Sequence, residues 1–191
     1  SLKLVFNNCY NTGSIMGGVE NGAFTAWTPR VTLNNCWNTG RIEKTGGYDG
    51  STSLARGNQP VRNNSYDLNA ENTDNAGAPA GYTAEWLTSG QLCYVMNGNK
   101  STDVAWYQEI GTDAQPYPFG TAVVYANGEL QCDGITPKEG SELSFSNTEG
   151  NTIDEHQWND WGFCAVCDEM QPDFMEPVDG IFFVANEKEL N

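Results

Sequence analysis

The stretch Phe6-Asn7-Asn8-Cys9-Tyr10-Asn11-Thr12-Gly13-Ser14-Ile15 returns 27 residues later as Leu33-Asn34-Asn35-Cys36-Trp37-Asn38-Thr39-Gly40-Arg41-Ile42, with seven of the ten residues identical. A weaker third copy spans residues 62–69, at an offset of 29, with Ser65 in place of the cysteine. Repeat periods of 20 to 50 residues indicate stacked structural units. The copies are too rich in Asn, Gly, Thr and β-branched residues for paired helices, which leaves short strands and turns.

One copy per coil of a parallel β-helix explains the repeat, because equivalent residues of successive coils then lie about 4.8 Å apart and form ladders. Interior positions are expected to stack Phe6 over Leu33 and Ile15 over Ile42. A small inward stack is expected from Cys9, Cys36 and Ser65. The asparagines expected to form a corner ladder are Asn8, Asn35 and Asn64. Asparagine suits such a corner because it tolerates the left-handed turn and its amide bonds to the amide above it.

An aromatic residue follows the cysteine position in every copy, as Tyr10, Trp37 and Tyr66. Spacing alone does not decide whether this column faces the core or the solvent. An exposed column would offer a platform on which sugars stack. The candidate ligand-binding residues are then Tyr10 and Trp37 from the column, together with Trp27 outside it. The alternative is an aromatic ladder that packs inside the protein.

The repeat resembles the GLUG-type repeats of large secreted bacterial surface proteins, especially those of gut Bacteroidetes. The resemblance is carried by the turns Asn8 to Gly13 and Asn35 to Gly40 and by the strand 16–24. The resemblance covers about a third of the chain and implies a right-handed parallel β-helix. We therefore expect a mainly β fold, with coils followed by a small mixed α+β module.

The residue composition and the periodicity change after the repeats, and we expect the chain to consist of four segments. Coils occupy 1–70, an Asn-, Ala- and Gly-rich linker 71–82, a Cys/His module 83–176, and the start of a following repeat unit 177–191. Both ends suggest a segment of a longer protein with neighbouring domains.

Two local elements are expected inside the module. Ser89 is a candidate N-cap for a short helix that ends at Asn97-Gly98, with Leu92, Cys93 and Met96 on one side. Strand 122–125, the Asn127-Gly128 turn and strand 129–132 predict a hairpin.

Cys132, His156, Cys164 and Cys167 form the only grouping with the spacing of metal ligands, and His156 is the only histidine in the chain. Two thiolates three positions apart can hold one tetrahedral ion, and a distant Cys with one His completes a Cys3His zinc site. Because the protein would fill all four positions, the predicted zinc is structural. A disulfide from Cys132 to Cys164 or Cys167 is the alternative. The stretch also resembles small Cys/His tails found in the same surface proteins.

Composition and missing motifs exclude several function classes. The 191 residues carry a net charge of −16 and contain no basic cluster, which argues against nucleic acid and anionic membranes as partners. No Gly-x-Ser-x-Gly elbow, His-Glu-x-x-His helix or P-loop is present, so no catalytic residue is assigned and the chain is not expected to be an enzyme.

We therefore expect a non-catalytic segment of a secreted or cell-surface bacterial protein. It would act as an adhesin, spacer or carbohydrate-contacting scaffold, with glycans or surface components of host or bacteria as partners. The alternative is an accessory or catalytic part of a β-helical polysaccharide-degrading enzyme, which would need two carboxylates flanking a groove.

Overall fold

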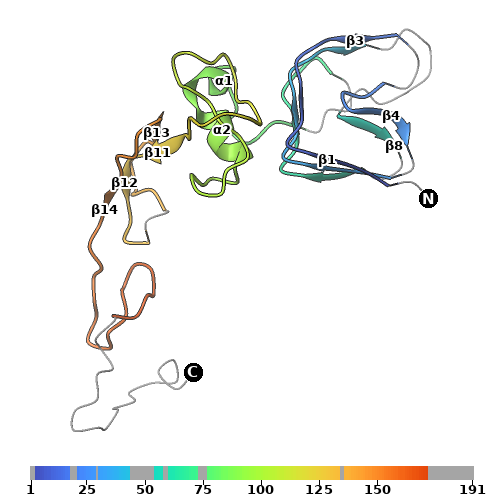
Figure 1. Ribbon diagram of the computed structural model, residues 1–191. Coiled ribbons are helices and arrows are strands. Elements are labelled where there is room, and N and C mark those ends of the chain that lie inside the picture. Colours follow the sequence, from blue (N-terminus) through green and yellow to red (C-terminus); the bar gives the residue numbers. More distant parts are fainter. Residues whose placement is uncertain are drawn as a thin grey trace. The chain divides into compact units, whose positions relative to one another are not determined.

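The computed structural model describes residues 3–17, 21–28, 30–43, 54–57, 60–72, 77–133 and 136–171, without the side chains of 27, 28 and 57. The described part is mainly β with two short helices, and its coils form a β-solenoid (Figure 1). The expected repeat unit at 177–191 lies outside the described residues. Within them, neither helix has the length and apolar character needed to cross a bilayer.

Successive coils of the solenoid contribute parallel strands that pair directly above one another. The first coil contains β1 (Leu4–Asn7), β2 (Tyr10–Asn11), β3 (Ile15–Met16) and β4 (Thr25–Thr28). The second contains β5 (Val31–Asn34), β6 (Trp37–Asn38), β7 (Ile42–Glu43) and β8 (Ala55–Gly57). The third contains β9 (Val61–Asn63) and β10 (Tyr66–Asp67). The sheets run β1-β5-β9, β2-β6-β10, β3-β7 and β4-β8, which confirms stacked parallel coils.

The register between coils is the one that the repeat predicts. Phe6 pairs with Leu33, and Ile15 pairs with Ile42. The corner asparagines Asn8, Asn35 and Asn64 adopt positive φ angles of 53°, 52° and 45°. Nδ2 of Asn35 donates to Oδ1 of Asn8 at 3.3 Å, and Nδ2 of Asn64 donates to Oδ1 of Asn35 at 3.0 Å. The predicted asparagine ladder is therefore confirmed.

The interior of the coils is apolar. Its fully buried members are Val31, Leu33, Cys36, Leu54 and Ala55, with Leu4, Phe6, Cys9 and Phe24 packed against them. Burying a side chain such as that of Leu33 contributes about 2 kcal/mol. The second coil, covered above and below, therefore holds most of this core.

Residues 86–96 form two short helices, α1 (Trp86–Ser89) and α2 (Gln91–Met96). Gly90 joins them at φ 89°, in the left-handed region that glycine adopts without strain, and a Cβ there would also push against Cδ1 of Ile110 at 2.6 Å. Leu92, Cys93 and Met96 are fully buried in α2. The predicted helix and its buried face are confirmed, but Ser89 is not the N-cap: it is the last residue of α1, and Gly90 occupies the N-cap position of α2 without a side-chain cap hydrogen bond.

The helices and the coils share a second core. The buried members are Trp37, Leu68, Trp86, Leu92, Cys93, Met96, Trp106 and Val124. The ring centroids of Trp37 and Trp106 lie 6.0 Å apart. The coils and the helices therefore belong to one compact unit, which consists of residues 1–126 and 145–148. A second unit consists of residues 127–144 and 149–191.

The strands that follow the helices do not form the predicted hairpin. β11 (Tyr125–Asn127) is hydrogen-bonded to β13 (Ser144–Ser146), and β12 (Glu129–Leu130) pairs in parallel with β14 (Thr152–Ile153). Gly128 donates its N–H to Oδ1 of Asn151 at 3.2 Å and accepts a hydrogen bond from the N–H of Thr152 at 3.1 Å. The hairpin prediction was wrong because residues 150–152 take the hydrogen bonds of the turn.

Candidate metal centre

The parallel pairing of β12 and β14 brings the first two candidate ligands together. Leu130 is the partner of Ile153 in the register. Cys132 follows Leu130 by two residues, and His156 follows Ile153 by three. Because parallel strands end on the same side of their sheet, the thiol and the imidazole emerge at one place.

The other two ligands lie in a small antiparallel loop. Cys164 and Trp158 form an isolated antiparallel β-bridge, and the N–H of Cys164 donates a hydrogen bond to the carbonyl of Glu169 at 2.8 Å. A tight turn ends after Cys167, where the N–H of Asp168 donates to the carbonyl of Cys164 at 3.0 Å. Asp168 has φ 60°, a conformation that Asp adopts more readily than most residues. This turn places the two thiols of the Cys-x-x-Cys pair on the same side.

The four ligand atoms all lie within 4.8 Å of one another. Sγ of Cys132 is 3.4 Å from Sγ of Cys164 and 3.4 Å from Sγ of Cys167. Nδ1 of His156 is 3.4 Å from Sγ of Cys167. A disulfide needs about 2.05 Å between sulfurs, and all three cysteines of the cluster are unbridged. The cluster that the sequence predicts is thus assembled and could bind a metal.

The electrostatics of the cluster favour a cation. Burial raises the pKa of Cys164, but N–H groups of Cys167 and Val166 and the side chains of His156 and Cys132 outweigh it, so the net pKa is lowered. The pKa of the Cys132 thiol is raised, first by burial and then by its two neighbouring thiols. Three thiolates therefore repel one another unless a positive ion lies between them.

His156 is oriented by groups beyond the cluster. Nε2 lies 3.4 Å from a carboxylate oxygen of Glu169, which leaves Nδ1 directed toward Cys167. The imidazole also stacks on Trp158, with ring centroids 4.5 Å apart. A carboxylate on the distal nitrogen fixes the tautomer of a metal-binding histidine and raises its basicity. Glu169 could not be recognised from the sequence, because nothing in its spacing separates it from the other 24 acidic residues.

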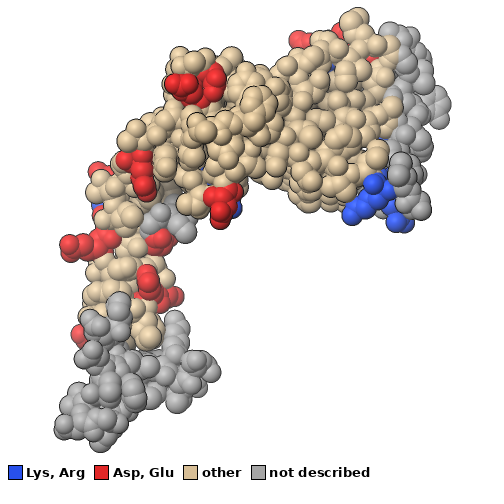
Figure 2. Space-filling view, in the orientation of Figure 1, with Lys and Arg blue, Asp and Glu red and all other residues tan. Residues whose placement is uncertain are grey.

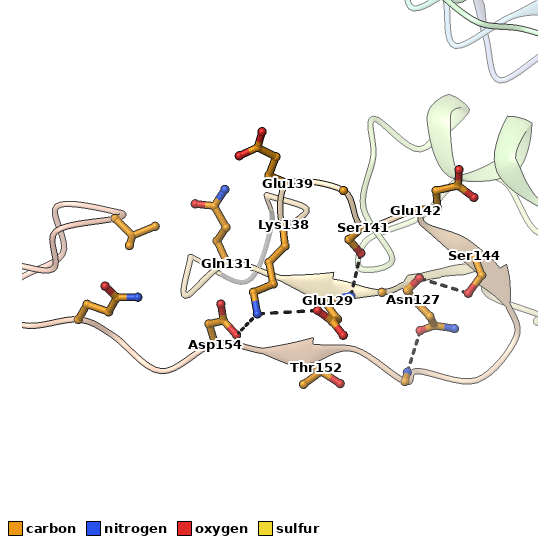
Figure 3. Close-up of a pocket in the computed structure, with 15 residues that line it drawn as sticks. Asn127, Glu129, Gln131, Lys138, Glu139, Ser141, Glu142, Ser144, Thr152 and Asp154 are labelled. Atoms are coloured by element: carbon orange, nitrogen blue, oxygen red, sulfur yellow. Dashed lines mark hydrogen bonds and ion pairs between the residues drawn. The ribbon is translucent and has the colours of Figure 1, made fainter.

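An open groove of about 1030 Å³ lies in the same unit (Figure 3). Nζ of Lys138 lies between two of its carboxylates, 2.9 Å from Asp154 and 3.8 Å from Glu129. The ion pair with Asp154 raises the pKa of Lys138. Both carboxylates are therefore paired with the same lysine. Figure 2 likewise shows acidic side chains scattered over the visible face, not gathered into one patch.

The three candidate sugar-binding aromatics have different surroundings. Trp37 is fully buried, so it has no free face in this structure. Tyr10 is partly buried and stacks on Trp37, with centroids 5.1 Å apart. The side chain of Trp27, in β4, lies outside the described residues. For Tyr10 and Trp37 the structure places the aromatic column against the core, as the packing alternative expects.

Within the described part of the chain, Asp67 at the third coil is the only buried acid. Burial raises its pKa, while hydrogen bonds from Asn38, Asn72 and the N–H of Asn69 act in the opposite direction. Its carboxylate oxygens accept from Nδ2 of Asn72 at 3.1 and 3.0 Å. This acid therefore serves the packing of the coils.

Comparison with known proteins adds no relative: no family model, no curated protein and no solved structure matches the chain. The assignment of function therefore depends on the geometry of the chain itself.

Proposed function

We propose that this chain is a non-catalytic scaffold whose second unit is held together by a structural zinc ion. The observation that carries the proposal is the convergence of Cys132, His156, Cys164 and Cys167 within 4.8 Å. All four donors come from the protein, which leaves no position for water or substrate on a tetrahedral ion.

Zinc fits the donor set better than other common ions. Three thiolates and one imidazole suit a borderline-soft metal and are poor ligands for magnesium or calcium. In a tetrahedral site with bonds of about 2.3 Å to sulfur, thiolates lie about 3.8 Å apart. The Sγ atoms of this cluster lie 3.4 Å apart, so they need to move apart only slightly to coordinate a zinc ion.

The second unit needs such an ion because it has little apolar interior. Its buried apolar residues, among those described, are Leu130, Cys132 and Cys164. Two of these three are metal ligands. Small domains that cannot bury enough apolar surface use metals or disulfides instead, so the free energy of metal binding would supply the folding free energy of this unit.

The wider role follows from the coils and the sequence pattern. Stacked parallel coils with interior ladders supply a rigid body, and two of the groove carboxylates, Glu129 and Asp154, are paired with Lys138. With the resemblance of the repeats to GLUG-type coils, this supports a spacer, adhesin or carbohydrate-contacting segment of a secreted or cell-surface bacterial protein. A right-handed coil and an α+β module stapled by zinc belong to the same proposal.

Metal analysis of the native protein tests the proposal. We expect one zinc per chain, and three further thiols that react with a thiol reagent only after chelation. Cobalt substitution should give the thiolate-to-metal absorption of a tetrahedral site. Metal-free protein with oxidised Cys132, Cys164 and Cys167 would contradict the zinc site, and release of reducing sugar ends from polysaccharides would contradict the non-catalytic role.

A further inference from the structure

The thiols of the metal centre differ in their access to solvent. Cys164 is fully buried, and Cys132 is 8% exposed. Cys167 is partly exposed, and the two residues before it, Ala165 and Val166, are exposed. Exposure and thiolate character decide which cysteine is oxidised. An oxidant dissolved in water therefore meets the sulfur of Cys167 first.

A second thiol lies within reach of Cys167. Sγ of Cys132 is 3.4 Å from Sγ of Cys167, whereas two bonded sulfurs lie about 2.05 Å apart. The two atoms therefore have to approach each other by about 1.4 Å. Cys132 follows β12, and Cys167 belongs to the loop that carries the Cys-x-x-Cys pair. A disulfide between them would join the same two segments that the zinc ion joins.

Cys164 is held by its own turn. Its Sγ accepts the N–H of Val166 at 3.4 Å, and its carbonyl accepts the N–H of Asp168 at 3.0 Å. A disulfide from Cys164 to Cys167 would have to form inside this turn and disturb these hydrogen bonds. Cys132 approaches from a separate segment, so it is the better partner for Cys167.

We propose that Cys167 is an oxidation site, and that a hydroperoxide such as hydrogen peroxide converts the zinc-bound centre into a Cys132–Cys167 disulfide. This inference rests on the structural zinc of the proposed function. The thiolate of Cys167 attacks one peroxide oxygen, which breaks the O–O bond, forms a sulfenic acid and releases hydroxide. The thiolate of Cys132 then attacks that sulfur and displaces a second hydroxide. The two sulfurs lose two electrons, and the peroxide gains them.

The oxidised centre still ties the second unit together. Only Cys164 and His156 remain as donors, so the zinc ion is released. The new disulfide keeps the end of β12 attached to the Cys-x-x-Cys loop, and disulfides and metals serve the same purpose in units with little apolar interior. Reduction by a dithiol restores both thiolates and with them the metal site.

The cysteines of the coils and helices serve as internal controls. Cys36 and Cys93 are fully buried, and burial raises their pKa to about 11 and about 12. They stay protonated at neutral pH and react slowly with peroxide. Cys9 is partly exposed. Cys9→Ser is a matched control because Ser65 already occupies the equivalent position in the third coil.

Peroxide treatment of the zinc-loaded full chain, followed with a chromophoric zinc indicator, tests the inference. We expect release of about one zinc ion per chain, and restored zinc binding after dithiothreitol and added zinc. Trypsin cleaves after Lys100, Lys138 and Lys188, so Cys132 lies in peptide 101–138 and Cys167 in peptide 139–188. Mass spectrometry without reduction should find these two peptides linked, with fragmentation placing the bond at Cys167.

Two variants test the site of attack. Cys9→Ser should release zinc at an unchanged rate. Cys167→His keeps four donors for zinc but removes the exposed thiol, so it should release zinc at least about 10-fold more slowly. If Cys167→His binds no zinc, the disulfide mapped in the natural chain decides.

Several results would overturn the inference. The first is zinc that stays bound in peroxide. The second is a disulfide that omits Cys132 or Cys167, or sulfinic acid with no disulfide. The third is equal release from the natural chain and from zinc-loaded Cys167→His. A chain that holds no zinc under reducing conditions contradicts the proposed function and this inference with it, whereas a zinc-loaded chain that resists peroxide contradicts this inference alone.

Discussion

Replacement of Asn35 measures how much the corner ladder contributes to stability. Asn35 donates to Asn8 and accepts from Asn64, and both hydrogen bonds are lost in Asn35→Ala. Each bond contributes about 1 kcal/mol. The φ of 52° at Asn35 adds about 1 to 2 kcal/mol when a Cβ-bearing residue without a polar side chain takes the left-handed conformation. The expected loss in unfolding free energy is therefore about 3 to 4 kcal/mol.

Glycine separates the two contributions. Asn35→Gly loses the same hydrogen bonds but accepts the left-handed backbone, so we expect a loss of about 2 kcal/mol. Asn8→Gly, at the first coil, removes one ladder bond and should cost about 1 kcal/mol.

Urea unfolding followed by tryptophan fluorescence measures these differences, since Trp37 and Trp106 lie in the core of the same unit. Equal losses for the Ala and Gly variants of Asn35 would refute the argument from backbone conformation. Losses below about 0.5 kcal/mol for both would refute the ladder as a source of stability.

Three further predictions concern the metal centre and the buried acid. Cys164→Ser should reduce bound zinc to less than about a tenth of one ion per chain, while the urea unfolding of the first unit stays unchanged. The control Cys93→Ala, at a buried thiol that is not a ligand, should leave bound zinc unchanged and destabilise the first unit. Equal effects of the two variants on both measurements would contradict the assignment. Glu169→Gln should weaken zinc affinity about 10-fold in a competition titration with a chromophoric chelator, and unchanged affinity would exclude its role in orienting His156. Because the pKa of Asp67 is raised in the folded protein, its contribution to stability is complete below the pKa of the unfolded carboxyl and is lost as pH rises through the folded pKa. Wild type should therefore gain stability relative to Asp67→Asn as pH falls from about 7 to 4, and a constant or opposite difference in urea midpoints would contradict this.

The metal ligands could be predicted only in part. The unique histidine and the Cys-x-x-Cys pair identify themselves by residue type and spacing. Their meeting with Cys132 depends on the parallel pairing of β12 with β14, whereas the Asn127-Gly128 signal predicted a hairpin. Turn signals are local, and side chains and backbone from residues 150–152 outcompeted that turn. Glu169 became recognisable only once its distance to His156 was known.

The amino-acid sequence alone determined the coils and their register. Equivalent residues recur at a fixed offset, and a one-residue slip would break the asparagine ladder and turn every interior side chain outward. Only the tertiary structure decided which way the aromatic column faces. The same spacing suits an exposed or a buried column, and the outcome depends on what packs against it. Trp106, distant in sequence, covers Trp37, because burying two indoles against each other removes more apolar surface from water than leaving both exposed.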